Sequence, residues 1–405
     1  MLGAPLAGLR IVEFSAFVAA PLGGMTLAQL GADVIRIDPL GGNIDFQRMP
    51  HAPGGDSLYW ASLNKGKKSV ALALGTAEGQ EIARKIICAP GANAGILLTN
   101  MPARPWMEHA RLAEQRPDMI AVRLVGNHDG SPALDYTVNC ASGFPIATGA
   151  THDPVNHVLP AWDVAAALYI AIGILAAERV RRESGCGQEI RLALSDVMLA
   201  TVANLGYVAD VQVNGTSRAP IGNDLYGAFG RNFATADRRE VMVVAISQKQ
   251  WEALGKATGL GARLAMIGPM LDLDLATEEG RFEALDAISA VLKPWFARRS
   301  LAEIGRIFDL AGVLWGPYQD FHQLVRDDPR CSTANPMFEQ VDQPGIGRLL
   351  SPRSPVAFST STTPPAMVAP TLGADTAAVL RSVAGLSEQD LKRLAQNGII
   401  GTHIH

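Results

Sequence analysis

An aspartate at the start of an apolar segment is the residue of this chain best placed to do chemistry. Asp163 follows Leu159-Pro160-Ala161-Trp162 and directly precedes the apolar run 164–177. Aspartate is a favoured helix N-cap worth about 1 kcal/mol, so a capping role alone would explain the position. The free N–H groups and partial positive charge of a helix start also lower a carboxyl pKa. A carboxylate kept ionised in this way is suited to nucleophilic catalysis, and the pattern leaves both roles open.

The densest basic cluster is the segment Asn64-Lys65-Gly66-Lys67-Lys68, which comes just before a predicted strand. A phosphate-rich ligand would find three ammonium groups here, although a solvated turn would carry the same residues. Three arginines would join this cluster if the strand ends converge: Arg36, Arg48 and Arg104.

Two glycine-rich segments offer backbone to a ligand. The stretch 15–24 contains Val18 and Ala19 and lacks GxGxxG, so it fits either ligand approach at a helix start or tight strand–helix packing. The stretch 222–230 fits a lid, a hinge or an ordinary hairpin turn.

Four bulky aromatic residues are candidates for the walls of a small pocket, and each is equally compatible with a place in the core: Phe17, Trp60, Tyr136 and Phe229.

Composition excludes several classes of protein. The net charge of −4 argues against a polycationic nucleic-acid binder. The four cysteines form no CxxC pair, and neither HExxH nor GxSxG occurs, so we expect no metal site, redox dithiol or serine hydrolase. The apolar run 164–177 is too short to cross a bilayer and predicts a fully buried helix. With no signal peptide recognisable, we expect a cytoplasmic protein without a membrane partner.

Alternating apolar strands and helices predict a doubly wound α/β fold with a parallel, Rossmann-like sheet. The predicted strands are 9–14, 33–38, 69–74, 94–99, 119–125 and 188–194, and the helices between and after them are 21–30, 77–88, 107–116, 164–182 and 195–211. Ligands of such sheets sit beyond the carboxyl ends of the strands. Functional residues are therefore expected after Phe14, Asp38, Thr99 and Val125.

The composition changes near residue 213, which predicts a second, smaller α+β domain. We expect a large domain over 1–212, a small domain with its linker over 213–328, and a return segment over 329–405. The return segment is rich in proline at first and ends in two helices, near 376–384 and 387–397, that pack on the large domain.

Several segments, in order along nearly the whole chain, resemble the class III CoA-transferase family, the carnitine/formyl-CoA transferase group. The matching segments are 5–13, 30–38, 63–69, 172–179 and 185–188. This resemblance implies that Asp163 is the catalytic aspartate and that it forms first a mixed anhydride and then an aspartyl-CoA thioester. Backbone N–H groups near the helix start are candidates to stabilise the oxyanions.

The resemblance also implies where CoA is held. CoA enters as part of a thioester substrate, a CoA ester of a small dicarboxylic acid, and no separate cofactor or metal is expected. Family members are interlocked homodimers. The expected CoA contacts are Val18, Ala19, Arg36, Asn64, Lys65, Lys67, Lys68, Asn100, Arg104, Tyr136, Gly222 and Asn223.

Within the family, the chain is most similar to members that move CoA between the two carboxyl groups of mesaconate, from C1 to C4. The segments that carry this likeness are 15–31, 155–163, 225–230, 331–338 and 343–347. An alternative is a transferase acting between two separate carboxylic acids. An acyl-CoA racemase is less favoured, because Leu134 stands where family racemases carry a catalytic histidine. Gly222-Asn223-Asp224 replaces the triple-glycine lid of family transferases, which puts lid closure in doubt.

Overall fold

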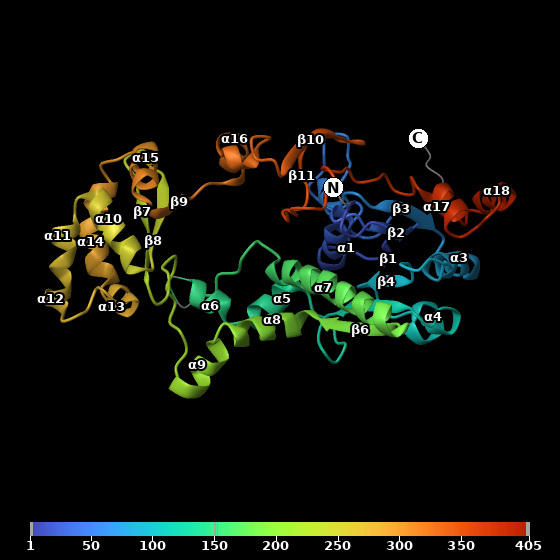
Figure 1. The fold of residues 1–405 in the computed structure, drawn as a ribbon, viewed down its shortest axis with the longest axis horizontal. Coiled ribbons are helices and arrows are strands. Elements are labelled where there is room, and N and C mark those ends of the chain that lie inside the picture. The colour runs from blue at the N-terminus through green and yellow to red at the C-terminus, as the bar shows by residue number, and fades with distance from the viewer. Residues whose placement is uncertain (1–2, 150, 152, 402–405) are drawn as a thin grey trace. The chain divides into compact units, whose positions relative to one another are not determined.

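The computed structural model describes residues 3–149, 151 and 153–401 and divides into two compact units (Figure 1). The first unit comprises Met1–Ser142, His157–Val213 and Pro329–His405, and the second comprises Gly143–Asn156 and Asn214–Asp328. The sequence analysis placed 143–156 in the large domain, whereas its contacts place this segment in the second unit. A segment so far from 214 along the chain gives no local sign of that association.

The first unit is built on a six-stranded parallel sheet, which confirms the predicted α/β class. Its strand order is β3-β2-β1-β4-β5-β6. The strands are β1 (Arg10–Phe14), β2 (Asp33–Pro39), β3 (Lys68–Leu72), β4 (Ile96–Thr99), β5 (Ile120–Val125) and β6 (Gln188–Ala193). The order reverses at the pair β1 and β4, which are direct neighbours with Phe14 opposite Thr99. A reversal of this kind creates a crevice beyond the strand ends where ligands bind.

Alternate residues of β1 face two different helical layers, as strand geometry requires. Val12 and Phe14 join the core that the sheet forms with α3 (Ala77–Ile87), α4 (His109–Gln115), α17 (Thr376–Ser382) and α18 (Glu388–Gln396). Glu13 faces α1 (Ala19–Gln29), where a Cβ on Gly24 would lie 1.8 Å from its Oε2 atom. Helix α1 packs against α7 (Ala161–Ser184) through Gly23, next to Ile170. The close approach of α1 to α7 therefore requires Gly23, and its close approach to β1 requires Gly24.

Helix α7 is only partly buried, so the expectation of a fully buried helix over 164–177 is wrong. One face packs against α1, while Leu168 is 50% and Ile172 is 61% exposed. By length and composition α7 is also long and apolar enough to cross a membrane, and the bent pair α8–α9 meets the same criterion. The predicted helix 195–211 is in fact this pair, α8 (Leu194–Asn204) and α9 (Tyr207–Asn214), bent by 58° at Gly206.

The second unit has its own core around a three-stranded antiparallel sheet, β7 (Phe229–Ala234), β8 (Glu240–Ala245) and β9 (Leu314–Pro317). Phe229, proposed above as a pocket wall, is fully buried in this core against Trp251. The helices of this unit are α6 (Phe144–Thr148), α10 (Gln248–Thr258), α11 (Gly261–Ala265), α12 (Ile267–Leu271), α13 (Glu278–Glu283), α14 (Leu285–Phe296), α15 (Leu301–Ala311) and α16 (Phe321–Asp327).

The remaining elements of the first unit are short. Helix α2 (Leu58–Leu63) precedes β3, and α5 (Asp135–Cys140) follows β5, while η1 (Pro105–Met107) and η2 (Pro329–Cys331) are single 3-10 turns. The return segment contains a hairpin of β10 (Phe338–Gln343) and β11 (Gly347–Pro352), which the sequence analysis missed because it expected only a proline-rich path.

Candidate active site

Asp163 is the third residue of α7, so it does not cap the helix as the sequence suggested. The N-cap position is Pro160, which supplies no side-chain hydrogen bond. The helix start is capped instead by Asp135, whose Oδ2 atom accepts hydrogen bonds from the N–H groups of Trp162 at 2.7 Å and Asp163 at 3.0 Å. A buried carboxylate from α5 therefore satisfies the orphan N–H groups of α7.

This cap changes the electrostatics of Asp163. Its carboxylate makes no hydrogen bond or ion pair within the described part of the chain, and the side chain is half-buried. Burial, with the negative charge of Asp135 as a second cause, raises the pKa of Asp163 to about 7. The expected lowering of this pKa is therefore wrong: burial and the charge of Asp135 raise it, and the nearby helix N–H groups donate to Asp135 instead of to Asp163. Asp163 is left as a basic, unpaired carboxylate, about half ionised at neutral pH.

The same cap removes the backbone oxyanion donors that the sequence suggested at this helix start. The N–H groups of Trp162 and Asp163 already donate to Asp135. A different donor lies nearby: burial, with the charges of Asp163 and Asp45 as smaller causes, raises the pKa of Tyr59 to about 12, while Arg48 opposes this shift. Tyr59 therefore remains a neutral phenol near Asp163, able to donate a hydrogen bond. The sequence analysis missed Tyr59, which lacks any local motif.

Tyr136 and Arg48 complete the surroundings of Tyr59. Tyr136 is a further, smaller influence on the pKa of Tyr59, and its hydroxyl donates a hydrogen bond to the Val158 carbonyl at 3.3 Å. The Arg48 guanidinium lies over the rings of Phe17 and Tyr59, 5.5 and 5.2 Å from their centroids. Phe17 and Tyr136 are both predicted to be walls of the pocket. Phe17 contacts Arg48, and Tyr136 lies close to Tyr59.

The turn after β1 is braced at the point where the strand order reverses. The Asn100 side chain accepts a hydrogen bond from the Ala16 N–H at 3.0 Å and donates one to the Ala16 carbonyl at 2.8 Å. Phe17 has φ of 65°, a left-handed conformation uncommon for a residue with a side chain. Val18 follows as the N-cap of α1 without a side-chain cap, so the first N–H groups of the helix, from Ala19 onward, have no side-chain acceptor there.

Three of the predicted CoA contacts are instead enclosed in a buried polar network. Arg36, 1% exposed, donates to Asp38, Asp45, Asn64 and the Ser15 carbonyl. Lys67 donates to Glu13 at 2.7 Å and also to the Asn64 side chain and the Pro21 carbonyl. Asn64 itself has no exposed surface. Arg36, Asn64 and Lys67 therefore have no side-chain surface to offer a ligand, contrary to expectation, because each is saturated by partners.

The other predicted cations keep some exposed surface, although Lys65 is half-buried. Lys65 donates to the Ser62 carbonyl at 2.8 Å, and burial lowers its pKa to about 8. Lys68 is paired with Asp33 at 2.6 Å. Arg104 follows β4 and lines an open hollow of about 440 Å³ together with Arg111 and Trp106. The sequence analysis did not select Arg111, whose place beside Arg104 arises only when α4 folds back next to η1.

The last two predicted contacts belong to the second unit. Gly222 has φ of 61°, and its N–H donates to the Gly149 carbonyl, whereas Asn223 is exposed. The next residue, Asp224, is tied to Arg231 at 2.6 Å. The predicted contact of Gly222 and Asn223 with CoA stays a prediction.

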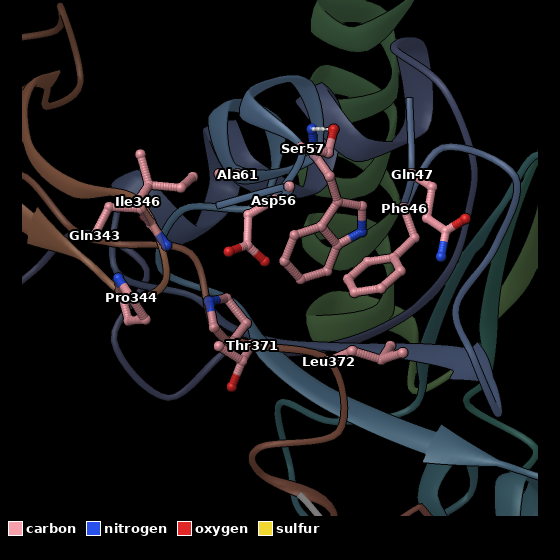
Figure 2. A pocket seen from close by; sticks show the side chains of 13 residues that line it. Phe46, Gln47, Asp56, Ser57, Ala61, Gln343, Pro344, Ile346, Thr371 and Leu372 are labelled. Carbon is pink, nitrogen blue, oxygen red and sulfur yellow. Dashed lines mark hydrogen bonds between the residues drawn. The ribbon is translucent and has the colours of Figure 1, made fainter. Parts of the chain in front are cut away.

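A separate cavity of about 200 Å³ lies beside α2 in the first unit (Figure 2). Trp60, adjacent to Tyr59, lines it, and its ring packs edge-on against Phe46 at 5.3 Å between centroids. Figure 2 shows the carboxylate of Asp56 directed into this space. Trp60 is thus a cavity and core residue. Across the described residues, no three His, Cys, Asp or Glu side chains gather as metal ligands would, and the expected absence of a metal stays a prediction.

The fold and the site together define a doubly wound α/β protein with an unpaired, basic carboxylate at a helix start. Comparison with known proteins identifies the family of this chain. The model of CoA-transferase family III matches residues 6–376. The chain belongs to this family and is an enzyme, with the CoA-transferase activity of the family.

Individual relatives cover almost the whole chain. It is 52% identical over 398 residues to the 2-methylfumaryl-CoA isomerase of Chloroflexus aurantiacus, covering 98% of this chain and 97% of the relative. It is 27% identical to the succinyl-CoA:mesaconate CoA-transferase of Haloarcula marismortui, covering 83% and 85% of the two chains. The crystal structure of a CaiB/BaiF family protein from Brucella suis matches with a TM-score of 0.74 and 25% identity, over 93% of this chain and 99% of that one.

Proposed function

We propose that the protein moves CoA from C1 to C4 of mesaconate, converting 2-methylfumaryl-CoA into 3-methylfumaryl-CoA within one active site. The observation that carries this proposal is the unpaired, basic carboxylate of Asp163, in a chain 52% identical to a 2-methylfumaryl-CoA isomerase. A nucleophile of this kind supports transfer by covalent catalysis.

The reaction uses Asp163 twice and needs no net proton. A carboxylate oxygen of Asp163 attacks the C1 thioester carbonyl, and the C–S bond breaks to release CoA thiolate and leave a mixed anhydride. The thiolate attacks the Asp163 carbonyl, the bond from that carbon to the bridging oxygen breaks, and mesaconate is set free within the site. Its C4 carboxylate then attacks the aspartyl-CoA thioester and expels the thiolate. Attack of the thiolate on the C4 carbonyl completes the product and regenerates Asp163.

The geometry of the site supports these steps at two points. The Asp163 carboxylate has no hydrogen-bond partner to reduce its nucleophilicity within the described residues. The neutral Tyr59 phenol is a donor for a carbonyl oxygen that gains negative charge during each attack. A bound thiolate and a trapped acid also react as one molecule, which lowers the entropic part of the barrier.

CoA is proposed to lie along the strand ends, from the start of α1 to the hollow beside β4. The uncapped first turn of α1 at Val18 and Ala19 offers N–H groups to a phosphate. Arg104 and Arg111 line the hollow beside η1 and offer guanidinium groups to further phosphates. Lys65 and Lys68 stay candidates at the surface, and Asn100 acts by holding the Ala16 backbone.

An interlocked homodimer is part of the proposal. Apolar residues remain exposed along α7 and α9, among them Leu168, Ile172 and Val211, in the described chain considered by itself. Exposed apolar faces on this scale are covered by another surface in most proteins. The cytoplasmic location likewise stays a prediction.

The test is to incubate the purified protein with the C1 thioester of mesaconate and separate the two regioisomers by chromatography. We expect the C4 thioester to form, and Asp163→Ala to abolish its formation. Labelled free mesaconate added to the same reaction should stay out of the product. Incorporation of label would favour the alternative, a transferase that acts between two separate acids. Solvent deuterium at a carbon next to the thioester carbonyl would instead indicate a racemase.

A further inference from the structure

Arg48 differs from Arg36, the buried arginine of the same sheet edge, in having no anionic partner among the described residues. Arg36 is enclosed by Asp38 and Asp45, whereas Arg48 is exposed, and its guanidinium forms no ion pair or hydrogen bond with any residue that the structure describes. A guanidinium has five N–H donors in a fixed plane, suited to binding a carboxylate through two parallel hydrogen bonds. Arg48 is therefore a cation that can accept a ligand.

The Arg48 side chain is held in place although it has no charged partner. Its guanidinium lies over the rings of Phe17 and Tyr59, at 5.5 and 5.2 Å from their centroids. Contact of a cation with aromatic faces leaves the N–H groups at the edge of the guanidinium plane available to a ligand. The arginine is thus positioned before any anion binds, which reduces the entropy that binding would cost.

The backbone of Arg48 is also fixed, from both sides. Its N–H donates to the Asp45 carbonyl at 3.2 Å, and its carbonyl accepts a hydrogen bond from the Ser57 hydroxyl at 2.5 Å. The Asp45 side chain is in turn held by the buried Arg36 at 3.0 Å. The buried network that the sequence analysis took for a phosphate site therefore anchors the loop that presents Arg48.

Tyr59 links Arg48 to the nucleophile. The Arg48 guanidinium lies over the Tyr59 ring, and the negative charge of Asp163 acts on the same phenol. Arg48 and Asp163 form no salt bridge with each other in the described structure, so neither one neutralises the other. The unpaired cation thus lies over the ring of a tyrosine whose phenol also senses the charge of the nucleophilic carboxylate.

We propose that Arg48 binds the free carboxylate of the acyl group and selects CoA esters of dicarboxylic acids. This inference rests on the proposed transfer at Asp163 and adds a specificity residue to it. At the start, Arg48 holds the C4 carboxylate while C1 lies at Asp163. After the acid turns, Arg48 holds the C1 carboxylate while C4 lies at Asp163. One fixed cation serves both halves of the reaction because the two ends of the acid exchange places.

The test compares two esters in a first-step assay, in which CoA thiol release is followed in the presence of hydroxylamine. One ester is the C1 thioester of mesaconate, and the other carries a methyl group in place of the free carboxylate. With Arg48→Gln we expect kcat/KM for the dicarboxylic ester to fall about 10- to 100-fold, as expected for loss of charged hydrogen bonds. For the CoA ester that carries a methyl group in place of the carboxylate, kcat/KM should stay within about threefold, since this ester has no carboxylate for the guanidinium to bind.

Two further variants separate positioning from folding. Arg48→Lys keeps the charge but loses the paired donors, so it should recover part of the lost activity. Arg348→Gln, which changes an exposed arginine on β11, should leave both esters unaffected. An equal loss for both esters in Arg48→Gln would overturn the proposal. Absence of any regioisomer conversion by the unaltered enzyme would instead overturn the proposed function, so the two failures are distinguishable.

Discussion

Two carboxylates, Asp135 and Asp163, have different tasks at the start of α7. Asp135 is 4% exposed, and one of its oxygens holds two backbone N–H groups, while its Oδ1 atom has no partner among the described residues. Asp163 has no such partners, and its pKa is raised to about 7. Environments that differ this much allow one carboxylate to hold the helix and the other to act as the nucleophile.

Replacing Asp135 by asparagine should shift the pH dependence of the enzyme. In the unaltered protein we expect kcat/KM to rise with pH and to reach half its maximum near pH 7, because Asp163 must lose its proton to attack. Asp135→Asn keeps an oxygen acceptor for α7 but removes a negative charge. The half-maximum should therefore move about one pH unit lower. A pH profile of kcat/KM checks this, and an unmoved midpoint would show that Asp135 does not affect the charge of Asp163.

Replacing Asp163 by asparagine should make the protein more stable and inactive. The folded state raises this pKa from 3.8 to about 7, so the native protein binds the proton more tightly than the unfolded chain does. The stability that this proton gives is therefore present below pH 4 and is lost as pH rises to about 7. The full shift corresponds to about 4 kcal/mol, and solvent screening of the half-buried side chain reduces it. At pH 8 we therefore expect Asp163→Asn to increase the free energy of unfolding by about 2 kcal/mol, with little change at pH 4. Urea unfolding at both pH values tests the difference.

At the scale of elements, buried charges connect segments that lie far apart in the chain. Lys67, at the start of β3, meets Glu13 on β1 and the Pro21 carbonyl on α1. Both charged side chains have no exposed surface. Replacing one partner of such a buried ion pair leaves the other charge without compensation in the interior.

Lys67→Met should therefore act on stability and not on CoA binding. We expect the free energy of unfolding to fall by about 3 kcal/mol, because Glu13 loses its cation. The double variant Lys67→Met with Glu13→Leu should recover much of this loss, since neither charge remains. Denaturant unfolding and the KM for the CoA ester, measured on the same variants, check the assignment. A raised KM with unchanged stability would restore Lys67 as a ligand contact.

At the scale of the whole molecule, the exposed apolar face of α7 is the feature that needs a partner. Ile172 and Leu168 lie one helical turn apart on that face, and they are 61% and 50% exposed. The proposed homodimer gives this face a covering surface.

Ile172→Asp should convert the dimer to a monomer. We expect light scattering to give about twice the chain mass of 42.9 kDa for the unaltered protein and the chain mass for the variant. A charge placed in an apolar interface is costly to desolvate, whereas an exposed helix position tolerates it. Circular dichroism serves as the folding control. A monomeric unaltered protein would contradict the homodimer.

Local patterns along the chain were enough to predict the class of fold and the principal residue of the site. Strand and helix periodicity is local, so the parallel sheet was predictable, and the strands after which ligands bind followed from it. Asp163 was found from its place before an apolar helix, and the family resemblance assigned its role. The bend at Gly206 was missed because the flanking segments match one longer helix. Strand β7 was missed because it begins inside the glycine-rich stretch 222–230.

Which charged residues are available to a ligand depends on contacts between segments that lie far apart in the chain. Lys67 meets Glu13 across 54 positions of the chain, and Trp162 meets Asp135 across 27, distances at which no local pattern carries a signal. Ion pairing in the interior keeps Arg36 and Lys67 away from a ligand, whereas Arg48 stays open. Burial, together with the negative charge of Asp135, raises the pKa of Asp163, where a local helix argument lowers it. The reason is physical: burial and pairing depend on which segments meet in space, and these set the energy of a charge.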